Sequence, residues 1–134
     1  MNEGHEVVAP TGLAPAVGFS HAVVAAQGRL VFLAGQTAQD EAGVIRGQGM
    51  TEQFDRALAN LLTVLREAGG EPEHLVSLTV YVTDMDAYRQ ATRELGQVWR
   101  ERFGRHYPAM ALVEVTSLVD PAAVVEVQGM AVVA

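Results

Sequence analysis

Residues 51–70 read TEQFDRALANLLTVLREAGG, and residues 75–82 read LVSLTVYV. In the first stretch the apolar side chains recur every three or four residues, so they fall on one side of a helix. The pair Gly69-Gly70 is typical of a helix end. In the second stretch β-branched residues dominate, which favours a strand. These two stretches predict a helix over residues 51–68 and a strand over residues 75–82.

The flanking sequence predicts five or six more elements. Residues 21–27 and 29–34 are β-permissive runs separated by Gln27-Gly28, which indicates a hairpin. Residues 40–49 are rich in glycine and acids, so we expect a loop. A second helix should begin near Asp84 and Asp86, whose carboxylates suit a helix start, and should end near residue 103. Strands are expected over residues 110–115 and 124–133, with room for another near residues 6–9.

This order of elements predicts one α+β domain over residues 1–134. We expect a mixed sheet of about five to six strands with two helices packed on one face. Several strands are nevertheless apolar on both faces, as residues 31–34 (VFLA) illustrate. Because the chain offers nothing else to cover the second face, another subunit is expected to cover it. The strand pattern therefore predicts an obligate oligomer.

Composition excludes several classes of function. The chain has no cysteine, which removes disulfides and thiolate chemistry, and its nine basic residues are all arginine, which removes lysine Schiff bases. A formal net charge of −7 argues against a nucleic-acid surface. The four histidines show no metal-ligand spacing and no cofactor motif is present, so we expect neither metal nor cofactor. Without a signal peptide or a membrane-length apolar run, a cytoplasmic protein is expected.

Several short motifs resemble the RidA (YjgF) family when they are taken together. The resemblance extends from about Ala14 to Val133 and rests on the order and spacing of the motifs. They are GFSHAV (18–23), LVFLAGQ (30–36), VYVTDM (80–85), YPA (107–109), VEV (113–115) and VEV (125–127).

This resemblance implies a chorismate-mutase-like fold and a homotrimer, with three clefts between neighbouring subunits. Members similar to RidA hydrolyse reactive enamines and imines, such as 2-aminoacrylate, to keto acids and ammonia. In those members an arginine grips the substrate carboxylate as a bidentate pair. A glutamate positions the attacking water, and a tyrosine near the N-terminus lines the cleft.

The family's arginine motif differs in this chain. The family reads Pro-Ala-Arg where this sequence reads Pro108-Ala109-Met110. A methionine is apolar and cannot bind a carboxylate. The family's glutamate aligns with Glu126, which the resemblance assigns as the catalytic residue.

Other cleft positions also differ. Phe19 stands at the tyrosine position, Ala34 at a serine position and Thr92 at an asparagine position. Together with Gly35, Leu112 and Met110, these residues are the predicted substrate-binding set. The replacements predict a more apolar cleft that is either inactive or suited to a less polar small molecule.

Glu126 has two interpretations. As a carboxylate on an otherwise apolar strand face, it could position water or act as a general base. It could instead pair with an arginine across a subunit interface. His21 and His106 also fall near cleft segments, where either could replace a lost polar contact.

Three functions follow from these alternatives. The first is a deaminase-type hydrolase with Glu126 activating water and a substrate that needs no carboxylate anchor. The second is a non-catalytic trimer that binds a small metabolite in its clefts. The third, ribonuclease or translation-inhibitor activity, is disfavoured by the acidic charge.

Overall fold

The computed structural model describes residues 4–134. It contains ten elements, and the expected strand over 75–82 is found with those bounds. In chain order they are β1 (Glu6–Val8), β2 (Ala22–Val24), β3 (Arg29–Gln36), α1 (Gly49–Glu67), the short 3-10 helix η1 (Pro72–His74), β4 (Leu75–Val82), α2 (Met85–Gln90), α3 (Thr92–Phe103), β5 (Ala109–Glu114) and β6 (Val125–Val133).

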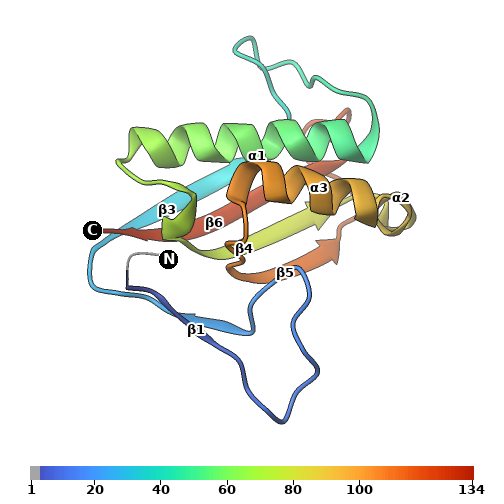
Figure 1. The fold of residues 1–134 in the computed structure, drawn as a ribbon. Helices are drawn as coiled ribbons and strands as arrows, with labels where there is room; N and C mark the ends of the chain where they lie inside the picture. Colours follow the sequence, from blue (N-terminus) through green and yellow to red (C-terminus); the bar gives the residue numbers. More distant parts are fainter. Residues whose placement is uncertain (1–3) are drawn as a thin grey trace.

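The six strands form two sheets. The larger sheet has the order β3-β6-β4-β5, in which β4 and β5 run parallel and the other neighbours run antiparallel. The strands β1 and β2 form a separate antiparallel pair. The helices α1 and α3 cover one face of the larger sheet, as Figure 1 shows. The predicted α+β class, the mixed sheet and the one-sided helical layer are therefore confirmed.

The core lies between α1, α3 and the central strands. Leu58 and Leu61 of α1 are completely buried, and they belong to the same apolar cluster as Val80 and Val127 of the two central strands. Trp99, the chain's one tryptophan, belongs to the same cluster and stacks on Phe103 of α3. The helical periodicity seen in residues 51–68 thus marks the side of α1 that meets the sheet.

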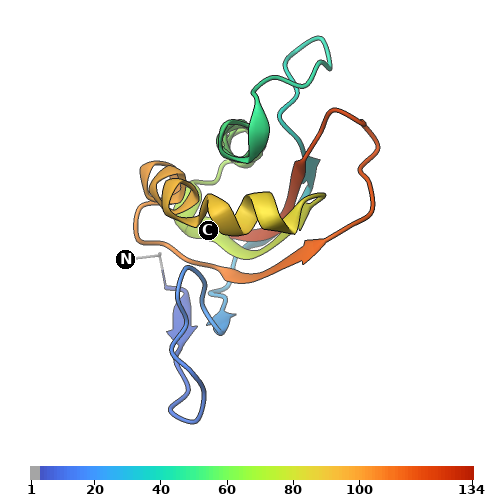
Figure 2. The ribbon, with the colours of Figure 1, turned by 90° about the vertical axis from the view of Figure 1, so that its right-hand side faces the viewer.

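The predicted hairpin between residues 21–27 and 29–34 is wrong. The strand β2 pairs with β1, whereas β3 pairs with β6. Residues 4–27, here called the N-terminal arm, leave the larger sheet on the side away from the helices (Figures 1 and 2). The arm returns to the body near β5, where the Ser20 amide donates to the Pro108 carbonyl at 3.0 Å. A two-residue turn motif predicts that the chain reverses direction, but it does not predict which strands pair with each other.

The predicted second helix is also interrupted. It is divided into α2 and α3 at Ala91, which leaves helical dihedral angles and whose amide bonds the Tyr88 carbonyl. The chain therefore has two short α-helices where one was expected. The predicted helix start is confirmed, because the Asp84 carboxylate accepts from the Ala87 amide at 3.0 Å. Apolar periodicity continues through the break, so the pattern alone could not locate it.

The face of the larger sheet opposite the helices, here called the open face, carries exposed apolar side chains. Phe32 is 72% exposed and Leu30 is 55% exposed, while Met130 of the adjacent strand is 37% exposed. Phe32 and Met130 are directly paired across β3 and β6. Contiguous apolar surface of this kind marks an interaction site. The helices leave this face uncovered, as the sequence predicted.

Gly35 lies at an irregularity in β3. The pairing of β3 with β6 shifts register between Leu33 and Gln36. At this point the backbone of Gly35 passes under the side chain of Glu126, and a methyl group on Gly35 would overlap the carboxylate oxygen Oε2. The glycine therefore provides the space that the glutamate side chain occupies.

The substitution Gly35→Ala should displace the Glu126 carboxylate. Because only the flexible end of a side chain must move, we expect a loss of unfolding free energy below about 1 kcal/mol. Gly129→Ala should cost more, about 1–3 kcal/mol, because its methyl group would meet the Ser77 backbone carbonyl at 2.7 Å. Urea denaturation measures both losses, and a crystal structure of the Gly35→Ala variant locates the carboxylate. An unmoved Glu126 would contradict the prediction.

Candidate functional site

Glu126 lies on β6 and projects from the open face. Its neighbours Val125 and Val127 are completely buried on the helical side, so alternation places the glutamate on the other side. The residue is half-buried, and Gly35 lies beneath its carboxylate. Within residues 4–134 no arginine, lysine or histidine is within ion-pair distance of this carboxylate. Glu126 is therefore available as a hydrogen-bond acceptor for a water molecule or a ligand.

Tyr81 and Gln128 flank Glu126 on the same face. Tyr81 is the direct cross-strand partner of Glu126, and its hydroxyl donates to the Gln128 Oε1 atom at 3.0 Å. This hydrogen bond turns the amide NH2 group of Gln128 away from Tyr81. The sequence interpretation missed Tyr81 as a site residue. Its position opposite Glu126 depends on the register between β4 and β6, which the sequence does not reveal.

Met110 and Leu112 lie on the other side of the sheet. Their partners on β4 are Leu78 and Val80, and both side chains pack against the apolar core. Thr92 begins α3, where its hydroxyl donates to the Arg89 carbonyl at 3.4 Å. Within one chain, therefore, these three predicted binding residues do not meet Glu126.

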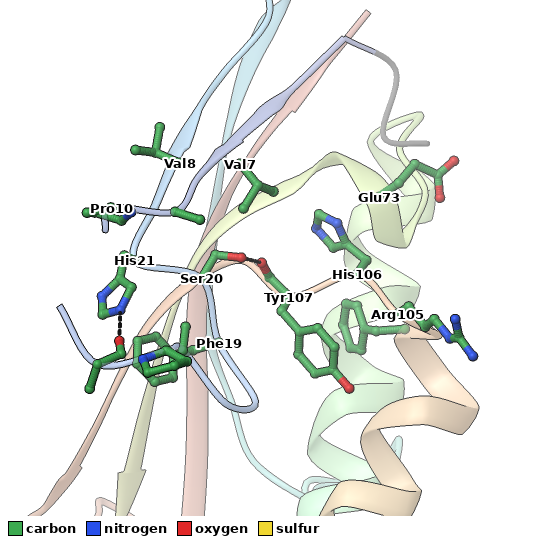
Figure 3. Close-up of a pocket in the computed structure, with 15 residues that line it drawn as sticks. Val7, Val8, Pro10, Phe19, Ser20, His21, Glu73, Arg105, His106 and Tyr107 are labelled. Atoms are coloured by element: carbon green, nitrogen blue, oxygen red, sulfur yellow. Dashed lines mark hydrogen bonds between the residues drawn. The ribbon is translucent and has the colours of Figure 1, made fainter. Parts of the chain in front are cut away.

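Phe19 belongs to a third group of residues, on the N-terminal arm. Its ring contacts His21 edge to face, with 5.3 Å between the ring centroids. Both side chains line a cavity of about 890 Å³ between the arm and the body. Figure 3 shows this cavity with Tyr107 and His106 opposite Phe19. The predicted site residues are thus distributed over the open face, the helical face near β5, and the arm.

The two histidines singled out in the sequence both bond to backbone carbonyls. The His21 Nε2 atom is 2.8 Å from the Ala14 carbonyl, within the arm. The His106 Nε2 atom is 2.6 Å from the Leu75 carbonyl, within the body. Burial lowers the pKa of His106 below its usual 6.5, although the bond to Leu75 acts in the opposite direction.

Two negative findings apply to the part of the chain that the structure describes. Residues 4–134 contain no group of three or more histidine, aspartate or glutamate side chains placed to hold a metal ion. None of the helices in this range combines the length and the apolar character needed to cross a membrane.

Comparisons with known proteins place the chain in a family. The model of the endoribonuclease L-PSP family matches residues 10–133. A RutC family protein of Synechocystis is 40% identical over 111 residues, covering 81% of this chain and 82% of the relative. The human 2-iminobutanoate/2-iminopropanoate deaminase is 27% identical over 111 residues, covering 82% of this chain and 74% of the human protein.

A solved structure shows the same fold. The crystal structure of YyfB from Yersinia pestis, a Rid family protein of unknown function, matches with a TM-score of 0.87 at 32% identity. The match covers 99% of this chain and 100% of YyfB. The arm makes up nearly a fifth of the chain. A TM-score of 0.87 could not be reached if none of the arm superposed on YyfB, so part of the arm superposes as well. From the family match and these relatives, we conclude that the chain belongs to the RidA/YjgF family, whose sequence model is described as endoribonuclease L-PSP.

Proposed function

We propose that this protein is a deaminase-type hydrolase acting on small imines or enamines that lack a carboxylate. The observation that carries the proposal is Glu126, which is free of ion pairs within the described chain and lies over a glycine that leaves room for it. The human relative named as a 2-iminobutanoate/2-iminopropanoate deaminase supports the reaction class. Acting as one domain over residues 1–134, the chain would need no cofactor for this hydrolysis.

A second copy of the chain would complete the site. Glu126 and Gly35 belong to the open face, whereas Met110 and Leu112 lie on the opposite side of the same sheet. If the apolar open faces of three copies pack together, the Glu126 side of one subunit can meet the β5 edge of the next. The proposed homotrimer therefore explains two features at once: the uncovered apolar face and the divided site.

The chemistry requires only water and one carboxylate. Glu126 accepts a proton from a water molecule as the water oxygen bonds to the carbon of the C=N group. The same carboxyl group then returns the proton to nitrogen, which gives a tetrahedral carbinolamine. The carboxylate then takes the proton of the carbinolamine hydroxyl and passes it to nitrogen, so that the carbonyl forms, the C–N bond breaks and ammonia leaves. An imine and one water thus yield a ketone or aldehyde and ammonia, with no redox step.

The lining of the proposed cleft determines its substrate class. We propose that Met110 occupies the position of the family's carboxylate-binding arginine. Without that guanidinium, an imino acid would lose a charge-assisted bidentate pair, which costs several kcal/mol by an order-of-magnitude estimate. Leu112 and Ala34 add further apolar surface. A neutral imine with an apolar substituent fits such a lining better than an imino acid does.

The same lining also suits a protein that binds without catalysing. A trimer whose clefts hold an apolar metabolite would need Met110, Leu112 and Phe19 but not Glu126. The apolar character of these residues favours this alternative. It would be supported by a thermal-shift screen that finds a neutral ligand, together with the same shift in a Glu126→Gln variant and no turnover.

Catalysis should depend on Glu126 but not on Glu114. Both glutamates sit in a Val-Glu-Val strand, but the Glu114 carboxylate accepts from the Met85 amide at 2.8 Å and so caps α2. With a neutral imine generated in situ, Glu126→Gln should lower kcat/KM by at least about 100-fold, the usual size of a general-base contribution. Ammonia release, coupled to a dehydrogenase assay, is the measurement.

Glu114→Gln is the matched control and should leave kcat/KM within about twofold, because the glutamine oxygen can still accept from the Met85 amide. Activity that survives Glu126→Gln would refute the assigned role. Complete inactivity of the wild-type protein on neutral imines and on 2-aminoacrylate would refute the hydrolase proposal.

The oligomer should depend on Phe32. Phe32→Glu places a charge in the middle of the open face, and burying that charge between subunits would be costly. We expect the wild-type protein to be a trimer and the variant to dissociate, as measured by multi-angle light scattering. Val119→Glu adds the same charge at a fully exposed loop position and should leave the trimer intact. A monomeric wild-type protein at micromolar concentration would contradict the prediction.

A further inference from the structure

The strand β3 forms an edge of the larger sheet that no other strand covers within residues 4–134. It pairs with β6 on one side only, and it lies at the other edge of the sheet from β5, as Figure 1 shows. Residues 30–33 of this edge read LVFL, without the charges or prolines that commonly protect an edge strand from pairing. This part of β3 is therefore able to accept another strand.

The strand β2 also has a free edge. Among the strands of the described chain it pairs only with β1, and Val24 is 54% exposed. Its sequence suits β3 as a partner, because the turn motif Gln27-Gly28 predicts an antiparallel pair of these two strands. In the register of that turn, Val23 lies opposite Phe32 and Val24 lies opposite Val31. The two valines of β2 would then cover apolar side chains of β3.

The position of Ser20 keeps β2 away from the β3 strand of its own chain. A line of paired residues crosses the sheet from β3 to the arm, namely Phe32, Met130, Ser77, Ala109 and Ser20. The place beyond β3 where Val23 would pair is therefore five strand spacings, or about 24 Å, from Ser20. Three residues of extended chain span at most about 11 Å. While Ser20 is docked, β2 cannot reach its own β3.

The docking of Ser20 on its own body is well supported. The residue is buried, its amide donates to the Pro108 carbonyl, and its hydroxyl donates to the Tyr107 carbonyl (Figure 3). Undocking Ser20 to form a hairpin within the chain would break both hydrogen bonds, and buried polar groups left unpaired are costly. A neighbouring copy can supply a β3 edge to β2 while both hydrogen bonds stay in place.

We propose that β2 of each copy pairs with the β3 edge of a neighbouring copy, so that the arms are exchanged around the assembly. The pairing that the sequence predicts within one chain is then made between two chains, as in a domain swap. Because β2 of one copy meets β3 of the next, the same interface repeats and closes as a ring. This inference rests on the proposed assembly of several copies but not on the proposed hydrolase activity.

Disulfide formation between β2 and β3 tests the exchange. The chain has no native cysteine, so Val24→Cys and Val31→Cys can be introduced together, and both replacements change the side-chain volume little. After mild oxidation of the assembled protein, we expect the monomer band on a non-reducing denaturing gel to be replaced by covalent dimers and trimers. Reduction should restore the monomer. Val24→Cys with Val119→Cys is the matched control and should stay monomeric on the gel, because Val119 is a fully exposed loop residue.

Several results would overturn the exchange. A monomer band without free thiols would show that β2 pairs with the β3 strand of its own chain. Covalent dimers from Val31→Cys alone would show that two β3 edges meet. Free thiols in a double variant that light scattering shows to be a trimer would refute the exchange and leave the proposed trimer standing. A monomeric wild-type protein would refute both.

Hydrogen exchange of the wild-type protein gives a second test that does not depend on the double variant folding. Every second amide of β3 points away from β6 and has no strand partner within the described part of the chain. In the assembled protein, pairing with β2 of a neighbouring copy should make these amides exchange as slowly as those that bond to β6. Fast exchange of the outward amides in the assembled protein would equally refute the proposal.

Discussion

The packing of α1 against the central strands of the larger sheet is the contact on which the rest of the structure depends. Leu58 and Leu61 pack with Val80 and Val127, and all four side chains are completely buried. This contact fixes β4 and β6 against the helix. Because successive side chains of β6 alternate between the two faces of the sheet, Glu126 projects from the opposite face. The burial of apolar area that stabilises the fold therefore also determines where the catalytic candidate projects.

The one-sided helical layer has a further consequence for function. A sheet with helices on one face leaves its other face apolar and uncovered, and this is the face that carries Glu126. The β5 residues Met110 and Leu112 lie beneath the helices instead. A cleft lined by Glu126 and by these β5 residues requires two copies of the chain. We therefore infer that the uncovered sheet face is the origin of both the assembly and the activity. The arm, which carries Phe19, adds a third component at the cavity between the arm and the body.

Much of this architecture could be predicted from the sequence, because it rests on local patterns. The periodicity of residues 51–68 and the β-branched run of residues 75–82 identified α1 and β4, and the apolar character of both faces of β3 predicted an uncovered sheet face. The wrong hairpin and the missed break at Ala91 have a different origin. Which strands pair with one another depends on tertiary contacts, and so does the position at which a helix is interrupted by one residue. No local sequence pattern encodes these contacts.

The candidate site was predictable only in part for the same reason. The family resemblance identified Glu126 and its glycine, and the structure brings them together. The resemblance could not reveal that Tyr81 is the cross-strand neighbour of Glu126, because that depends on the register between β4 and β6. It also could not reveal that Met110 and Glu126 lie on different faces of the sheet within one chain.

A crosslinking measurement tests the divided site most directly. The chain has no native cysteine, so Glu126→Cys and Met110→Cys can be introduced together and treated with a short bifunctional thiol reagent. The two positions lie on opposite faces of the sheet in one chain, so we expect crosslinks between chains, seen as covalent dimers and trimers on denaturing gels, and few in either single variant. A double variant that remains uncrosslinked while light scattering shows a trimer would contradict the claim that neighbouring subunits complete the site.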